Sequence, residues 1–178
     1  METVKVHNKE FALYLSAEQI AAAIKKLAVQ LNKELADKDV LFVGILNGSF
    51  LFAADLFRLM EFDCQITFLK LASYEGTFST GKVKRLIGLE QDIRGKTIVI
   101  IEDIVDTGVT LDFILKQLNG YGPKDIKFVT LLFKPEAYIK QQPIDYVCFE
   151  IPDKFVIGYG LDYNGFGRNL QHIYSAVE

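Results

Sequence analysis

An acidic pair followed by a glycine turn is the part of the sequence best suited to chemistry. Glu102 and Asp103 end a strongly apolar run, and the turn 106–110 follows shortly after them. The backbone amides of such a turn, together with the N-terminus of the helix after it, can bind a monophosphate without any lysine. Gly108 lets the backbone turn sharply. The sequence therefore predicts a phosphate site made by Asp106, Thr107, Gly108, Val109 and Thr110.

The carboxylates beside this site need a partner that a phosphate does not supply. Glu102 and Asp103 repel a phosphate, so they are expected to face a group that donates hydrogen bonds, carries a metal or becomes cationic. A sugar phosphate meets all three conditions, because its hydroxyls donate to carboxylates and an oxocarbenium ion is stabilised by nearby negative charge. A capped turn with solvated acids is the alternative for a generic segment, but the whole segment favours the sugar phosphate.

Strands alternating with helices are expected to position these residues. Helical spacing follows the capping box Ser16–Gln19 as far as Leu35, and further helical patterns cover residues 50–59 and 111–118. Continuous apolar runs between them are typical of strands buried on both faces. This alternation predicts an α/β domain with a mostly parallel central sheet flanked by helices. The expected strands cover residues 40–46, 65–71, 83–89, 97–101, 126–133, 146–150 and 155–158.

The carboxyl ends of these strands are expected to form the site, because ligands of parallel sheets bind in the crevice beyond those ends. Residues 72–84 are polar and rich in Ser, Thr and Gly, which predicts a long mobile loop. The other segments that follow apolar runs are Asn47–Ser49, 102–110, Lys134 and 155–168.

The composition indicates one globular domain over residues 1–178, with half of the residues hydrophobic and 24% charged. The 20 basic and 23 acidic residues give no nucleic-acid footprint. The longest uncharged run, Val40–Ala54, is too short to span a membrane, and no signal peptide is expected. Cys64 and Cys148 are expected to be free thiols, which indicates a cytoplasmic protein.

Two segments resemble motifs of a known family. Val99–Thr110 resembles the phosphoribosyl pyrophosphate (PRPP) motif of the type I phosphoribosyltransferases, and Ile151–Asn164 resembles the purine-recognition loop of the hypoxanthine phosphoribosyltransferases. Leu71–Tyr74 and Leu131–Lys134 fall in the matching order. The resemblance implies the type I phosphoribosyltransferase fold, with a mobile loop and a small hood formed by the N-terminal segment and by residues from about 145 onward.

The resemblance also implies an activity. It is the transfer of the 5-phosphoribosyl group from PRPP to N9 of a 6-oxopurine, hypoxanthine and also guanine, giving IMP or GMP and pyrophosphate in purine salvage. Mg²⁺ would accompany PRPP, and the family implies a homodimer or homotetramer. Two alternatives stay open: a transferase that prefers xanthine, and a PRPP-binding regulatory protein. Asp106, Lys134 and Phe155 together argue against the regulator.

Further roles follow from the resemblance. Glu102 and Asp103 would hold the ribose hydroxyls, and the turn 106–110 would bind the 5′-phosphate. Asp106 would be the general base that takes the proton from N7 while N9 attacks the anomeric carbon. Lys134 would donate to the purine 6-oxo group and so reject adenine. Around them the resemblance places the stacking ring Phe155, backbone contacts at Val156, and the catalytic loop residues Ser73 and Tyr74.

The pyrophosphate end of the site departs from the family pattern at one position. Asn47 stands where the family commonly has lysine, but the backbone amides of Asn47 and Gly48 can still bind pyrophosphate. The absence of the lysine charge would affect either the affinity for pyrophosphate or the contacts between subunits, and the sequence does not decide between them. Arg168 matches the cation on the leaving pyrophosphate, and the carboxylates expected near its magnesium ion are Asp162, Glu102 and Asp103.

Overall fold

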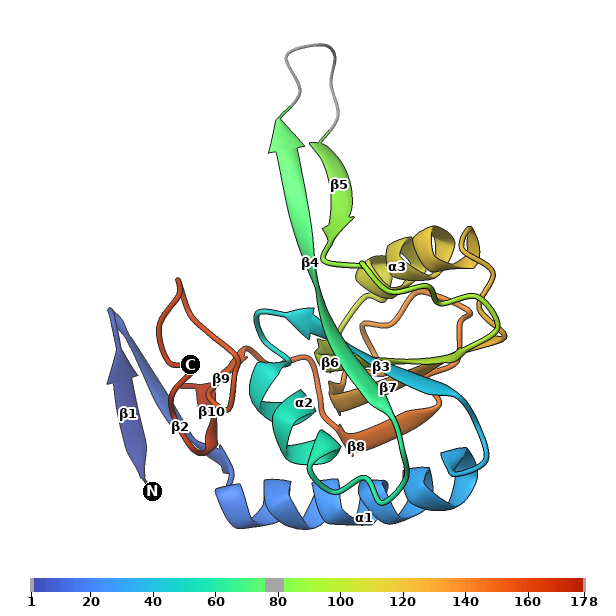
Figure 1. Cartoon of the computed structure of the whole chain (residues 1–178). Helices are drawn as coiled ribbons and strands as arrows, with labels where there is room; N and C mark the ends of the chain where they lie inside the picture. Colours follow the sequence, from blue (N-terminus) through green and yellow to red (C-terminus); the bar gives the residue numbers. More distant parts are fainter. Residues whose placement is uncertain (1, 76–81, 178) are drawn as a thin grey trace.

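The computed structural model describes residues 2–75 and 82–177 and contains two sheets (Figure 1). The larger sheet has six strands in the order β5-β4-β3-β6-β7-β8. Its five strands from β4 to β8 in this order are parallel, and β5 runs antiparallel to β4. The strands are β3 (Val40–Leu46), β4 (Gln65–Glu75), β5 (Lys82–Ile87), β6 (Thr97–Val105), β7 (Asp125–Phe133) and β8 (Tyr146–Glu150).

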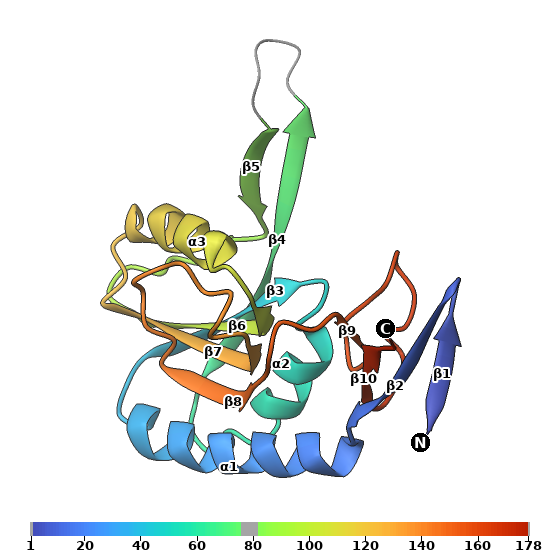
Figure 2. The same cartoon turned by 180° about the vertical axis from the view of Figure 1, so that it is seen from behind.

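Helices cover both faces of this sheet (Figures 1 and 2). The helices α1 (Ala17–Leu35) and α2 (Phe50–Phe57) pack on one face, where they meet Phe42 and Ile101. The helix α3 (Val109–Asn119) packs on the other face with Val43 and Ile100. Because successive strand residues point to opposite faces, a strand covered on both sides must be apolar throughout. The apolar runs therefore predicted the central strands, and the mostly parallel α/β fold is confirmed.

The second sheet joins the two ends of the chain. It has four antiparallel strands in the order β1-β2-β10-β9, with Phe11, Ile157 and Tyr174 buried between them. The sequence predicts a hood formed by the N-terminal segment and by residues from about 145 onward. The segment 146–150 does not belong to the small sheet, because it forms β8, which pairs with β7 in the large sheet. The strands of the small sheet are β1 (Thr3–Val6), β2 (Lys9–Leu15), β9 (Val156–Ile157) and β10 (Ile173–Ala176).

The expected loop 72–84 is shorter than predicted. β4 continues to Glu75, and β5 begins at Lys82, so the two strands form an antiparallel ladder. A two-stranded ribbon needs only backbone hydrogen bonds, and polar composition alone was therefore a poor guide. The rest of the expected loop, residues 76–81, lies outside the described residues.

Two smaller predictions are confirmed, the capping box and the free cysteines. The Ser16 hydroxyl accepts a hydrogen bond from the Gln19 amide at 3.3 Å, and the Gln19 side-chain oxygen accepts from the Ser16 amide at 2.9 Å, which completes the capping box of α1. Cys64 and Cys148 are both free, and burial raises the pKa of the Cys148 thiol to about 12. Within the described ranges, the helices fall short of the length and apolarity that crossing a membrane requires.

The apolar face of α1 supplies much of the core on its side of the sheet. Leu31 is fully buried, whereas Val29 on the same helix is 71% exposed. We expect Leu31→Ala to lower the free energy of unfolding by about 2–5 kcal/mol, because it removes buried methyl groups and leaves a cavity. Val29→Ala should change it by less than about 0.5 kcal/mol. Urea denaturation of both variants checks this, and equal losses would contradict the packing described for α1.

Candidate active site

The glycine turn after β6 surrounds a small cavity. Gly108 precedes α3 with a φ of +79°, a conformation that favours glycine. A Cβ atom at Gly108 would also collide with the ring of Tyr138. The cavity has a volume of about 90 Å³ and opens at the N-terminus of α3, as an anion site requires. It is lined by Glu102, Ile104, Val105, Asp106, Thr107, Gly108, Thr110 and Leu111.

The two carboxylates that end the apolar part of β6 are largely removed from solvent. Glu102 is only 7% exposed, and burial, followed by the charge of Asp103, raises its pKa well above the usual value. Burial also raises the pKa of Asp103 to about 6, although backbone amides and Arg168 oppose that rise. Buried carboxylates of this kind gain free energy when a ligand donates hydrogen bonds to them.

The loop after β3 lies directly against Asp103. The Leu46–Asn47 peptide is cis, the Asn47 side chain is exposed, and Gly48 is buried. A Cβ atom at Gly48 would collide with the Asp103 carboxylate, and one at Gly160 would collide with the Gly48 carbonyl oxygen. Glycine at both positions therefore lets three segments meet at close range. Gly48 thus lies against Asp103, and Asn47 precedes it in the same loop.

Asp162 and Arg168 form a local ion pair. An Arg168 guanidinium nitrogen lies 2.6 Å from Asp162 Oδ1, and another donates to the Gly160 carbonyl oxygen at 2.7 Å. The second Asp162 oxygen accepts from the Gly165 amide at 2.6 Å. Across residues 2–75 and 82–177, no group of three or more His, Cys, Asp or Glu side chains is arranged to hold a metal ion. Glu102, Asp103 and Asp162 are thus no ready-made three-carboxylate site.

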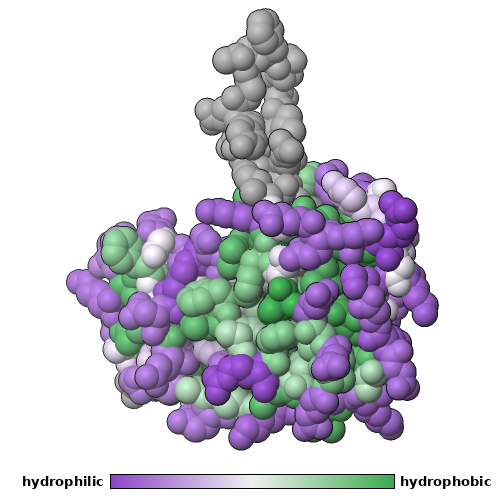
Figure 3. Space-filling view, in the orientation of Figure 1, coloured by the Kyte–Doolittle hydropathy of each residue, from purple (hydrophilic) through white to green (hydrophobic). Residues whose placement is uncertain are grey.

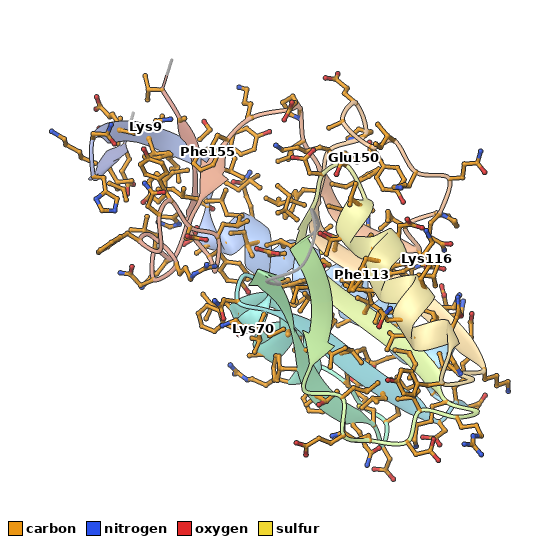
Figure 4. The ribbon with its side chains drawn as sticks, turned by 90° about the horizontal axis from the view of Figure 1, so that it is seen from above. Lys9, Lys70, Phe113, Lys116, Glu150 and Phe155 are labelled. Carbon is orange, nitrogen blue, oxygen red and sulfur yellow. The ribbon has the colours of Figure 1, made fainter. Side chains whose placement is uncertain are left out.

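A larger cavity lies beside the acidic pair, with a volume of about 280 Å³. Phe155 is 48% exposed there, and its ring meets Tyr163 edge-on, with 5.8 Å between the ring centroids. The Lys9 ammonium lies 5.8 Å from the centre of the Phe155 ring, and Figure 4 shows these two side chains together at the small sheet. The cavity is lined by Asp103, Ile104, Asp106, Lys134, Lys154, Phe155, Val156, Leu161 and Asp162.

Lys134 is held between two carboxylates. Its side chain is 8% exposed, and its ammonium lies 3.3 Å from Asp106 Oδ2 and 2.8 Å from Asp153 Oδ1. Burial lowers the pKa of Lys134, but the hydrogen bond to Asp153 and the charge of Asp106 outweigh that effect and raise it. Asp153 was not predicted as a site residue, although it lies inside the segment Ile151–Asn164 that carries the resemblance.

The structure thus brings most of the predicted residues to one region at the carboxyl ends of β3, β6 and β7. Ser73 and Tyr74 are a separate case. Their backbones pair with Lys84 and Val83 in the β4–β5 ladder, whereas their side chains lie outside the described part of the structure. Their catalytic role therefore stays a prediction.

The raised pKa of Asp103 has a measurable effect on stability. Between pH 4 and 6 the folded chain binds a proton at Asp103 that the unfolded chain has lost, so stability falls as the pH rises through this window. We expect Asp103→Asn to be more stable than the original chain at pH 8, by at most about 3 kcal/mol, and the difference to vanish below about pH 4.

Urea denaturation without divalent metals, from pH 4 to pH 8, measures this difference. Asp112→Asn is the control of opposite sign, because hydrogen bonds from Lys116 and Lys140 lower the pKa of Asp112. That variant should be less stable than the original chain at pH 8. A difference for Asp103→Asn that does not change with pH would contradict the burial of this carboxylate.

Known proteins are similar to this chain in sequence and in structure. A family model described as phosphoribosyl transferase domain matches residues 13–164. A hypoxanthine-guanine phosphoribosyltransferase of Streptococcus pneumoniae is 40% identical over 160 residues, which is 89% of each chain. A protein of the same name from Mycobacterium bovis is 38% identical over 91% of this chain and 84% of its own.

A solved structure gives the same result. The hypoxanthine phosphoribosyltransferase of Staphylococcus aureus superposes with a TM-score of 0.85 at 37% identity, covering 93% of this chain and 90% of that one. The residues that the family model matches include every residue that lines the two cavities. This chain belongs to the phosphoribosyltransferase family, in the group of the hypoxanthine-guanine phosphoribosyltransferases.

Proposed function

We propose that this protein transfers the 5-phosphoribosyl group from PRPP to N9 of hypoxanthine, and also of guanine, in purine salvage. The observation that carries the proposal is that a phosphate-sized cavity lined by Glu102 adjoins a larger cavity lined by Asp103, with Asp106 in both linings. Asp106 lines both cavities, and Lys134 and Phe155 line the larger one. The names of relatives that are 38–40% identical support the same activity.

The smaller cavity is the proposed site of the sugar phosphate. The turn amides and the N-terminus of α3 bind the 5′-phosphate, and the ribose hydroxyls donate to Glu102 and Asp103. These carboxylates then stabilise the positive charge that develops on the ribosyl ring as the bond from C1′ to the pyrophosphate oxygen breaks. The amides of Asn47 and Gly48, together with Arg168, bind the pyrophosphate that leaves with this electron pair.

The larger cavity is the proposed site of the base. Phe155 stacks on the purine, the Val156 backbone contacts its edge, and Lys134 donates to the 6-oxo group. The N7 proton moves to the Asp106 carboxylate while the N9 electron pair forms the bond to C1′. This arrangement selects 6-oxopurines, because an amino group at that position is not an acceptor for the Lys134 ammonium.

The donor set suits a magnesium ion that arrives with PRPP. Asp103 and Asp162 line the larger cavity, and carboxylate oxygens are the ligands that Mg²⁺ prefers. Glu102 is the third carboxylate proposed near the ion. Bound there, magnesium would neutralise charge on the leaving pyrophosphate. We also propose a cytoplasmic location, which the two free cysteines support.

One assay tests the proposal. The purified protein is incubated with PRPP and Mg²⁺ and with hypoxanthine, guanine, xanthine or adenine in turn, and nucleotide and pyrophosphate are measured. We expect IMP and GMP to form and adenine to be inert. Preferred use of xanthine would support the first alternative. PRPP binding without pyrophosphate release for any base would support a regulatory protein instead.

The role of Asp106 gives a sharper prediction. Asp106→Asn should lower kcat by about 10²- to 10⁴-fold, because the amide no longer accepts the N7 proton. PRPP affinity should stay within about threefold, since the phosphate is bound by backbone amides. Asp112→Asn, an acid on α3 that pairs with Lys116, is the matched control and should keep its kcat. Unchanged turnover of Asp106→Asn would remove this residue from the mechanism.

We also propose that the chain forms a homodimer or homotetramer. Apolar side chains gather over α2 and the adjoining part of β4 on the face shown in Figure 3. Phe50 and Phe68 are 38% and 36% exposed there, and the Phe68 ring lies over Gly44 beside Ala53 of α2. Exposed apolar patches of this kind mark interaction surfaces.

A charge in this patch should separate the subunits. We expect Phe50→Glu to shift the mass in solution toward the monomer, as measured by light scattering. Ile139→Glu is the control, because Ile139 is 72% exposed outside α2 and β4, and it should leave the mass unchanged. A monomeric original chain, or a Phe50→Glu variant of unchanged mass, would contradict assembly through this face.

A further inference from the structure

Asp153 makes the shorter of the two contacts to the Lys134 ammonium, at 2.8 Å against 3.3 Å for Asp106. The three ammonium protons therefore have two fixed acceptors, and one proton is left for a third group. Both Lys134 and Asp106 line the larger cavity, so the third N–H group of the ammonium can donate to an acceptor on a ligand bound there. Asp153 itself is not among the residues that line this cavity; it contacts Lys134 from the loop between β8 and β9.

Backbone hydrogen bonds fix both sides of this contact. The Lys134 amide donates to the Val105 carbonyl oxygen at 2.9 Å, which ties the lysine to the end of β6. The Ile151 amide donates to the Phe133 carbonyl oxygen at 2.8 Å, so the chain that leads to Asp153 is tied to the end of β7. The Lys154 amide donates to the Pro152 carbonyl oxygen at 2.7 Å and closes a tight turn around Asp153. The carboxylate is therefore presented by a constrained segment, although its side chain is 65% exposed.

This arrangement matters most when Asp106 changes its charge. An ammonium with Asp106 as its single partner would pair with it, and it would lose that partner once Asp106 takes up the N7 proton. Asp153 keeps its negative charge through that step, because no proton is transferred to it. The lysine therefore retains one counter-ion and one fixed direction before and after the proton transfer.

We propose that Asp153 is a positioning residue that aims the Lys134 ammonium at the 6-oxo group of the purine, and thereby helps to select the base. The proposal rests on the proposed function. The turn that carries Asp153 leads within two residues to Phe155, so one short segment sets both the stacking ring and the donor to the base edge. The proposed function assigns no PRPP contact to this turn.

Kinetics of Asp153→Asn test the proposal. The variant keeps the size of the side chain and removes its charge. KM for hypoxanthine should rise about 5- to 20-fold, because a misdirected ammonium loses much of the free energy of a charged hydrogen bond. Such a bond contributes a factor of about ten or more to affinity. KM for PRPP should stay within about twofold. Asp153→Glu should recover most of the loss, and Glu136→Gln, which removes an exposed charge two residues after Lys134, should behave like the original chain.

A second ligand separates positioning from a loss of shape. Unsubstituted purine lacks the 6-oxo group, so its inhibition constant against hypoxanthine should be the same for Asp153→Asn and the original chain. Unchanged KM for hypoxanthine in Asp153→Asn would overturn the proposal, as would equal weakening of hypoxanthine and purine. An original chain that forms no nucleotide from any base would instead refute the proposed function.

Discussion

Glu102 is buried and the adjacent Asp103 is half-buried at the carboxyl end of β6, and the rest of the site depends on the free energy of keeping these two carboxylates there. Removing Glu102 and Asp103 from water disfavours their charged forms, which the raised pKa of each reflects. The fold therefore holds a region that gains stability from hydrogen-bond donors or positive charge. A ribose supplies both, because its hydroxyls donate hydrogen bonds and its C1′ atom becomes cationic during the transfer.

The groups around these acids are fixed in place before a ligand arrives. The N-terminus of α3 follows the same strand, so the anion cavity and the acids keep a constant separation. Close glycine contacts place the loop after β3 against Asp103, and Arg168 reaches the same region from the far end of the chain. Lys134 lies between Asp106 and Asp153. Donors that are already oriented need little rearrangement when charge develops, which is the condition for electrostatic catalysis.

The sequence was sufficient to predict features that depend on local pattern. Apolar runs predicted the central strands because each is covered on both faces, and the segment 102–110 predicted the anion turn because strand, turn and helix follow one another directly. The strands β1, β2 and β10 were missed. β1 and β10 have only four residues each, and β10 pairs with β2, which is distant in sequence. For the same reason the Lys134–Asp153 pair was not foreseen: the resemblance gave Lys134 a ligand, and spacing alone does not reveal which carboxylate lies next to its ammonium.

Proton release on PRPP binding is the most direct test of the buried acids. Calorimetric titration near pH 6 with PRPP and Mg²⁺, in buffers of different ionisation enthalpy, counts the protons released. The original chain should release more protons than Asp103→Asn, because hydroxyl donors and a cation favour the charged carboxylate. Comparing the two chains cancels the protons that PRPP itself releases. Equal release from both, with PRPP bound to each, would contradict the claim that these acids receive the sugar.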